Sequence, residues 1–299
     1  MSETERLTLA NLTDLVHHGK RIAMVTAYDA SSAALADAAG LDIVLVGDSA
    51  AMTILGHDST LPVTMDEMLM LTRAVVRGVR RAFVVADMPF GTYQTGEDDA
   101  LRNAIRFVKD AGADAVKLEG AGRTLTRIGA ILDAGIPVMG HVGLTPQSAS
   151  LAGSYKARGR TAADAKRIYD EARALERAGC FAVVLEAIAA PVAAHITEAL
   201  KIPTIGIGAG AACDGQVLVW HDLLGLTRGH VPRFVKEYAD LAGTVQDALQ
   251  RYAADVRNST FPDDAHTYGI PAEELARFES QIGQARVGQD FTKTLRKRD

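Results

Sequence analysis

The sequence has very little cysteine. Its 299 residues include only Cys180 and Cys213, and these two form no Cys-x-x-Cys pair. This scarcity argues against a disulfide framework and against a thiolate zinc site, and it favours a reducing compartment. We therefore expect a cytoplasmic protein whose stability comes from an ordinary hydrophobic core.

Long apolar runs and a basic surface are also missing. No uncharged apolar stretch approaches the roughly 18 residues that a membrane-spanning helix needs. The N-terminal segment has acids early and lacks an apolar signal core. The net charge is −5, and basic residues are scattered except at the C-terminal end. Because a nucleic-acid-binding protein normally has a basic face, we expect neither a nucleic-acid partner nor a membrane partner.

What recurs along the chain is a short apolar run followed by a longer segment of helical pattern. The runs are about six residues long and rich in Val and Ile, which favours strands buried on both faces of a parallel sheet. They span residues 21–27, 42–47, 82–87, 114–119, 136–141, 181–186, 203–208 and 216–222. Eight strands that alternate with helices over about 250 residues predict a (β/α)8 TIM barrel, with an open doubly wound sheet as the alternative.

Helix boundaries can be read between the runs. Thr64 and Glu67 have the spacing of a capping box, and Ser31 is the predicted N-cap of a helix that ends at Gly40. The segment 161–179 has helical spacing and ends on glycine. These signals predict the helices that a barrel of alternating strands and helices requires.

The chain shows no internal linker, so we expect one domain with a C-terminal extension. Residues 1–262 are predicted to form the catalytic barrel. Residues 263–299 lose the strand alternation and are predicted to be partly helical or flexible, with a short helix that opens at Pro271.

The predicted strands end one after another in polar side chains. In a (β/α)8 barrel, these strand ends converge on the mouth where active sites are built. Asp48, Asp87 and Glu119 would supply the oxygen ligands that Mg²⁺ prefers. Any one of these acids could equally pair with a nearby base or cap a helix. Three acids at successive strand ends nevertheless predict a magnesium site.

Other polar residues at the strand ends allow two interpretations each. Lys117 and Glu119 lie two residues apart and point to the same side of a strand, so Lys117 either holds a substrate carboxylate or, more simply, pairs with Glu119. His141 is either a satisfied strand-end histidine or a substrate contact. Glu186 has no basic neighbour in the next several residues. An apolar setting would raise its pKa and suit a general base, and a helix-cap role is the comparable alternative.

Several stretches, taken together, resemble the ketopantoate hydroxymethyltransferase family. They run in order from about residue 7 to 268, and the longest are 46–68 and 140–148. The others are 25–29, 86–93, 116–120, 153–160, 183–187, 205–210 and 215–226. The resemblance implies a barrel of the phosphoenolpyruvate/isocitrate lyase type and an enzyme of pantothenate and coenzyme A biosynthesis.

The resemblance also implies a reaction. A hydroxymethyl group would pass from 5,10-methylenetetrahydrofolate to 3-methyl-2-oxobutanoate through a Mg²⁺-stabilised enolate, giving 2-dehydropantoate. The metal ligands would be Asp48 and Asp87, with Glu119 in or beside the metal shell, and Glu186 would be the catalytic base. The substrate-binding residues would be Asp48, Ser49, Asp87, Lys117 and His141. The family's usual assembly is a homodecamer.

Two rival functions stay open. A Mg²⁺-dependent C–C lyase on the same barrel commonly carries a catalytic Cys in a loop, and the stretch 153–160, which occupies that loop region, contains none. A barrel that has lost catalysis and serves as a scaffold is the second rival. Four carboxylates at one predicted mouth argue against a scaffold.

Overall fold

The strands close into a barrel in the computed structural model, which describes residues 5–148, 156–229 and 231–282. Eight parallel strands pair in chain order, and β1 pairs with β8. The strands are β1 (Ile22–Thr26), β2 (Ile43–Val46), β3 (Phe83–Asp87), β4 (Ala115–Glu119), β5 (Val138–Gly143), β6 (Ala182–Glu186), β7 (Thr204–Ile207) and β8 (Gly215–Leu218). The predicted (β/α)8 barrel is confirmed, and the open sheet is wrong because the first and last strands are hydrogen-bonded.

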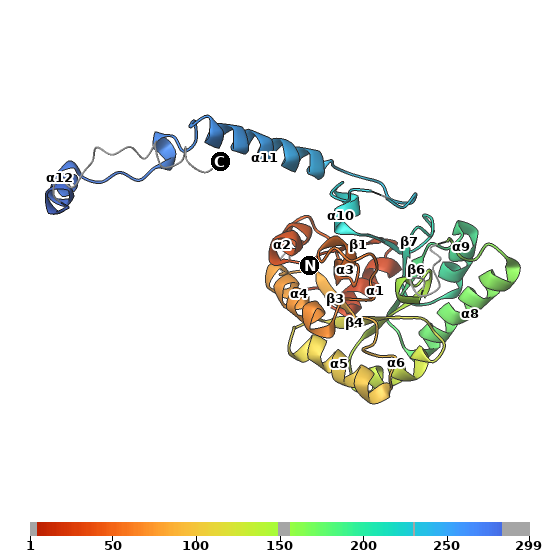
Figure 1. The fold of residues 1–299 in the computed structure, drawn as a ribbon. Coiled ribbons are helices and arrows are strands. Elements are labelled where there is room, and N and C mark those ends of the chain that lie inside the picture. The colour runs from red at the N-terminus through yellow and green to blue at the C-terminus, as the bar shows by residue number, and fades with distance from the viewer. Residues whose placement is uncertain (1–4, 149–155, 230, 283–299) are drawn as a thin grey trace. The chain divides into compact units, whose positions relative to one another are not determined.

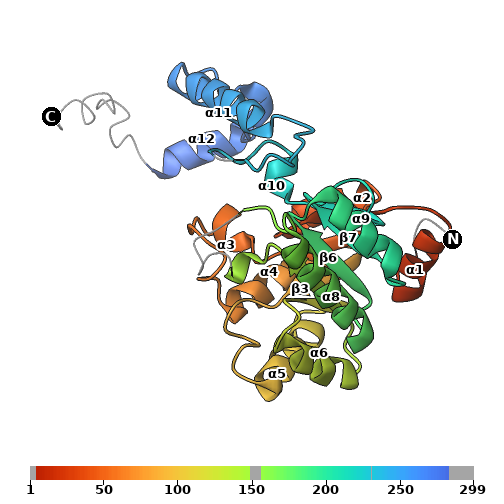
Figure 2. The same ribbon diagram turned by 90° about the vertical axis from the view of Figure 1, so that its right-hand side faces the viewer.

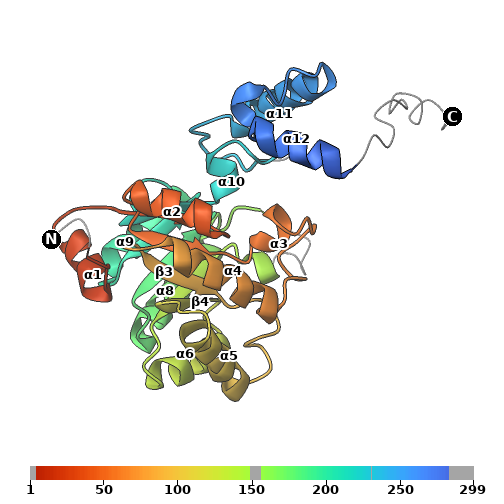
Figure 3. The same cartoon turned by 90° about the vertical axis from the view of Figure 1, so that its left-hand side faces the viewer.

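Helices follow one another around the strands (Figure 1). They are α2 (Ala30–Ala38), α4 (Met65–Gly78), α5 (Glu97–Lys109), α6 (Thr124–Asp133), α8 (Ala162–Ala178) and α9 (Ala190–Ala199). Three further helices are α1 (Leu9–His17), α3 (Ala50–Thr53) and α10 (Trp220–Leu223). Figures 2 and 3, which view the barrel from opposite sides, place α1 and α3 at opposite ends of it. The end that carries α3 is the end where the strands terminate.

The helix caps agree with the sequence in one case and differ in another. Thr64 and Glu67 form the predicted capping box at the start of α4. At α2 the N-cap is Asp29 and not Ser31, because the Asp29 carboxylate accepts the N–H groups of both Ser31 and Ser32. The negative charge of a carboxylate at this position also interacts favourably with the positive end of the helix dipole.

The barrel interior changes from apolar to polar along the strands. Leu12 of α1 packs into the inner apolar cluster, so the helix closes the end where the strands begin. The inner cluster includes Val85, Ala115, Met139 and Val184. Two residues further along the same strands stand Asp87, Lys117, His141 and Glu186. Because residues at i and i+2 point to the same side of a strand, this polar layer lies directly above the apolar one.

Carboxylates at the beginning of the strands have a different role. Asp42 accepts the N–H of Ala23, and Asp114 accepts the N–H of Val84. Asp214 accepts both the N–H and the hydroxyl of Thr204. Each of these acids therefore accepts a backbone N–H group from a neighbouring strand. We assign all three a structural role.

The chain divides into two compact units, residues 1–242 and the residues from 243 onward. This division comes before the predicted barrel end at residue 262. The reason is that α11 (Leu241–Arg257) buries none of its residues. The second unit also holds a 3-10 turn (Asp264–His266) and α12 (Ala272–Gln281), which begins directly after Pro271 as predicted. None of the described helices is long and apolar enough to cross a bilayer.

Candidate active site

Parallel pairing brings the polar strand ends together at one end of the barrel. In the register of the sheet, Asp87 lies opposite Lys117, and Glu119 lies opposite His141. Asp48 stands two residues beyond the end of β2, and Glu186 is the last residue of β6. The structure therefore gathers the predicted acids, the lysine and the histidine on adjacent strands β2 to β6, as expected for a barrel mouth.

Lys117 pairs with Asp87 and not with Glu119. Its ammonium nitrogen lies 2.7 Å from Asp87 Oδ1, and both side chains are buried. The simpler sequence interpretation, an ion pair with Glu119, is therefore wrong, because the neighbouring strand places another carboxylate nearer. Burial alone would lower the pKa of Lys117, but the charges of Asp87, Glu119 and Asp48 together raise it. Lys117 thus keeps its positive charge inside the barrel.

The acids around this single ammonium carry an excess of negative charge. Burial and then the charge of Asp87 raise the pKa of Asp48 to about 7. Burial and then the charge of Asp48 raise the pKa of Glu119 well above its ordinary value. Glu119 Oε1 is buried without a hydrogen-bond partner among the described residues. Such a site favours the entry of a further cation.

The donor set fits a magnesium ion in its chemistry. Asp48 and Asp87 are in contact, since the Asp48 N–H donates to Asp87 Oδ2 at 3.1 Å. In the described ranges, no three His, Cys, Asp or Glu side chains are already gathered closely enough to ligate one ion. Magnesium is usually held by one or two carboxylates and completes its shell with waters and substrate oxygens. Asp48 and Asp87 supply two adjacent carboxylates, and Glu119 supplies an oxygen, Oε1, that has no hydrogen-bond partner among the described residues. This set of oxygens fits Mg²⁺.

Of the polar side chains at the strand ends, that of Glu186 is the most accessible to solvent. Its side chain is 16% exposed, whereas those of Asp87 and Glu119 are 5% and 4% exposed. Burial raises the pKa of Glu186 to about 7, although the charge of Lys117 opposes the shift. The residue can therefore take up or release a proton near neutral pH and still be reached by a ligand.

His141 is neutral and lies between Lys117 and Glu186. Burial and then the charge of Lys117 lower its pKa well below the ordinary value. Its Nδ1 lies 3.3 Å from the ammonium of Lys117, which can only donate, so Nδ1 is the acceptor and the proton lies on Nε2. Nε2 lies 3.2 Å from Glu186 Oε2. The imidazole N–H thus lies beside the carboxylate of the predicted base.

Ser49 follows Asp48 and is held by a chain of hydroxyl groups. Its Oγ lies 2.8 Å from Tyr28 Oη, which accepts a hydrogen bond from Thr26. Thr26 in turn accepts the N–H of Trp220 at the start of α10. These hydrogen bonds fix the Ser49 hydroxyl. A Cβ atom at position 47 would lie only 2.7 Å from Ser49 Oγ, so Gly47 leaves room for this side chain.

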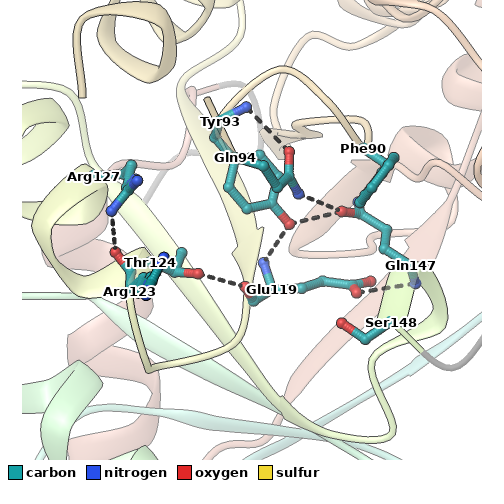
Figure 4. A pocket seen from close by; sticks show the side chains of 9 residues that line it. All are labelled: Phe90, Tyr93, Gln94, Glu119, Arg123, Thr124, Arg127, Gln147 and Ser148. Carbon is teal, nitrogen blue, oxygen red and sulfur yellow. Dashed lines mark hydrogen bonds between the residues drawn. The ribbon is translucent and has the colours of Figure 1, made fainter. Parts of the chain in front are cut away.

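Gln147 is a buried polar residue of the site that the sequence analysis did not single out. Its amide nitrogen donates to Asp48 Oδ2 at 2.9 Å and to the Met88 carbonyl at 3.1 Å. Its backbone N–H donates to Glu119 Oε2, and its amide oxygen accepts the Tyr93 hydroxyl (Figure 4). Gln147 therefore holds two of the predicted metal ligands in place. The only sequence signal was its position within the stretch 140–148.

Replacing Gln147 by Leu should weaken the site while leaving the fold intact. The variant would leave Asp48 without an amide donor, so we expect Mg²⁺ affinity to fall about 10- to 100-fold. Gln216→Leu, a change at an exposed glutamine of β8, is the matched control. Titration calorimetry with Mg²⁺ measures the effect, and an unchanged affinity in Gln147→Leu would contradict it.

Comparisons with known proteins identify a family for this chain. The sequence model of the ketopantoate hydroxymethyltransferase family matches residues 6–264. The 3-methyl-2-oxobutanoate hydroxymethyltransferase of Nitratidesulfovibrio vulgaris (strain DP4) is 57% identical over 263 residues, covering 88% of this chain and 86% of the relative. The enzyme of the same name from Carboxydothermus hydrogenoformans is 50% identical over 273 residues, covering 91% and 99%.

Solved structures with a similar fold have little sequence in common with the chain. Phosphoenolpyruvate phosphomutase from Streptomyces platensis subsp. rosaceus aligns with a TM-score of 0.57 at 18% identity, covering 92% of this chain and 96% of that one. A 2,3-dimethylmalate lyase of the PEP mutase/isocitrate lyase superfamily aligns with a TM-score of 0.55 at 16% identity, covering 92% and 99%. These structures share the barrel fold with the chain, whereas the sequence relatives share its family. The chain belongs to the ketopantoate hydroxymethyltransferase family.

Proposed function

We propose that the chain transfers a hydroxymethyl group from 5,10-methylenetetrahydrofolate to 3-methyl-2-oxobutanoate and so makes 2-dehydropantoate for pantothenate biosynthesis. The observation that carries this proposal is the position of Glu186. It is the most accessible carboxylate at the barrel mouth, burial raises its pKa to about 7, and its Oε2 lies 3.2 Å from His141 Nε2. The family relatives supply the substrates.

The proposed roles follow from what each residue can do. The Lys117 ammonium and the Ser49 hydroxyl bind the carboxylate of the keto acid, which fixes its C3 toward Glu186. Glu186 removes the C3 proton, and its raised pKa makes it a stronger base than an exposed glutamate. The neutral His141 lies beside Glu186, with its Nε2 3.2 Å from Glu186 Oε2.

We propose Asp48 and Asp87 as the metal ligands, with Glu119 in or beside the shell. Bound Mg²⁺ supplies Lewis acidity to the keto and carboxylate oxygens of the substrate. The excess of buried acids over the single Lys117 supports this assignment, because a divalent cation would relieve their repulsion.

Mg²⁺ should stabilise the protein in a pH-dependent way. At a free concentration about 100 times its Kd, the ion adds about 2.7 kcal/mol to the free energy of unfolding. The pKa of Asp48 is raised to about 7, so protons compete with the metal below that pH. We therefore expect the Mg²⁺-induced rise of Tm to grow between about pH 6 and pH 8.

The matched variants for this measurement are Asp87→Asn and Asp58→Asn. Asp58 is exposed and lies in the loop after α3. Differential scanning fluorimetry should show the Mg²⁺-induced rise in Asp58→Asn and lose it in Asp87→Asn. An equal rise in both variants would remove Asp87 from the metal site.

The function is tested by product analysis. Proton NMR should show 2-dehydropantoate when the enzyme is supplied with 3-methyl-2-oxobutanoate, 5,10-methylenetetrahydrofolate and Mg²⁺. Isocitrate and 2,3-dimethylmalate serve as probes for the rival lyase activity. Cleavage of either acid, together with absence of 2-dehydropantoate, would overturn the proposal in favour of the lyase.

We also propose a cytoplasmic homo-oligomer, a homodecamer by resemblance to the family. An apolar stripe on α11 supports assembly, because its residues recur at helical spacing and are exposed. The stripe consists of Val245, Leu249, Tyr252 and Val256. Sedimentation velocity of the full chain measures the assembly, and a concentration-independent monomer would contradict it.

A further inference from the structure

A cavity of about 300 Å³ opens beside the acid cluster. Two of its lining residues, Glu119 and Gln147, belong to the candidate active site, and Glu119 Oε1 has no hydrogen-bond partner among the described residues. Phe90 of the loop after β3 and Arg123 and Arg127 at the start of α6 also line it. Figure 4 shows Glu119 between Gln147 on one side and Arg123 on the other. A molecule in this cavity would therefore reach both the reacting centre and the two arginines.

The two arginines have no acidic partner within the part of the chain that the structure describes. Arg127 Nη1 donates to the Arg123 carbonyl at 2.8 Å and to Thr126 Oγ1 at 3.0 Å, which folds its guanidinium back over the first turn of α6. Arg102 and Arg167, by comparison, pair with acids on their own helices. The cavity thus holds two unneutralised guanidinium groups.

The start of α6 strengthens this positive charge. Arg123 is the N-cap, makes no side-chain cap bond, and is followed by a first turn without an acid. Since a helix N-terminus favours negative charge, two cations placed there cost free energy unless an anion accompanies them. The cavity is therefore suited to a ligand with carboxylate groups at this end.

An aromatic side chain forms another part of the cavity lining. Phe90 is 37% exposed, and the buried Tyr93 beside it donates its hydroxyl to Gln147. An exposed aromatic side chain in a cavity favours a planar apolar group. The ligand chemistry that these residues recognise is therefore an aromatic ring joined to a carboxylate-bearing tail.

We infer that this cavity binds the aminobenzoyl-glutamate part of the reduced folate. The benzoyl ring lies against Phe90, and the glutamate carboxylates pair with Arg123 and Arg127. The Thr124 hydroxyl donates to the Glu119 carbonyl at 3.2 Å, so the start of α6 lies against the end of β4. A single ligand in this cavity can therefore have its one-carbon unit toward the reacting centre and its glutamate toward α6. This inference rests on the proposed function.

Removing both arginines tests the inference. In Arg123→Ala/Arg127→Ala, the KM for 5,10-methylenetetrahydrofolate should rise about 10- to 100-fold, as expected for lost charge-assisted hydrogen bonds. The KM for the keto acid and the folate-independent exchange of its C3 proton should be unchanged. Arg102→Ala, which removes an exposed arginine of α5, is the matched control and should leave all three quantities unchanged.

A truncated folate separates recognition of the carboxylates from a general disturbance. With 5,10-methylenetetrahydropteroate, which lacks glutamate, wild type and double variant should have equal KM values. An unchanged folate KM with persistent C3 exchange would overturn this inference and leave the proposed function standing. An equal loss with the pteroate would also overturn it, because the arginines would then not bind the glutamate. Absence of both exchange and product in the wild type would overturn the proposed function as well.

Discussion

Glu186→Gln should lower kcat about 10³-fold, because it removes the group that takes the C3 proton. The amide keeps the size of the side chain and its place beside His141, so we expect the keto acid and Mg²⁺ to bind as in the wild type. Steady-state kinetics give kcat, and titration calorimetry gives both affinities. Glu198→Gln, an exposed glutamate on α9, is the control and should retain full activity.

The pH profile gives a second readout of the same residue. Burial raises the pKa of Glu186 to about 7, and the base acts only when it is deprotonated. The kcat of the wild type should therefore rise with pH through about 7 and level off above it. Asp48 also has a pKa raised to about 7, so the profile is measured at saturating Mg²⁺, where a metal ligand stays deprotonated. A flat profile from pH 5.5 to 8.5 would contradict the assignment.

Lys117→Met should raise the KM for the keto acid about 10- to 100-fold, because the substrate carboxylate loses its ammonium partner. The same change leaves Asp87 as a buried charge without its ion pair. Breaking a buried pair in this way typically costs about 3–5 kcal/mol. We therefore expect a lower Tm, with part of the loss recovered when Mg²⁺ is added.

The control for Lys117 is Lys109→Met, which removes an exposed lysine at the end of α5. This variant should match the wild type in both KM and Tm. An unchanged KM for the keto acid in Lys117→Met would remove its substrate role and leave only the structural pair with Asp87.

The barrel could be predicted because its strands are buried on both faces. Each strand is then a short apolar run that stands out against helical spacing, and each of the eight runs overlaps a strand. The run at 216–222 was the least regular. Its strand ends at Leu218, and Trp220 already begins α10. The grouping of the polar residues at the strand ends could also be predicted, because parallel strands place their carboxyl ends at one mouth of the barrel.

Contacts between distant parts of the chain could not be predicted in the same way. The pairing of Lys117 with Asp87 depends on the register between β3 and β4, whereas the sequence shows only that Glu119 is two residues away. Gln147 was missed for a similar reason. Its partners Glu119, Met88 and Asp48 lie 28, 59 and 99 residues away, so no local pattern marks it.

The caps show the same limit at short range. Ser31 and Asp29 are both good N-cap residues, and local propensity does not decide between them. Asp29 is the cap because its carboxylate reaches two N–H groups of the first turn.

The central claim is that Glu186 removes the C3 proton of the keto acid at this barrel mouth. The most direct test is proton NMR of 3-methyl-2-oxobutanoate in D₂O, without folate, using wild type and Glu186→Gln with and without Mg²⁺. The account predicts Mg²⁺-dependent loss of the C3 proton signal with the wild type and no loss with the variant. Equal exchange in both proteins would contradict the account, because another group would then be the base.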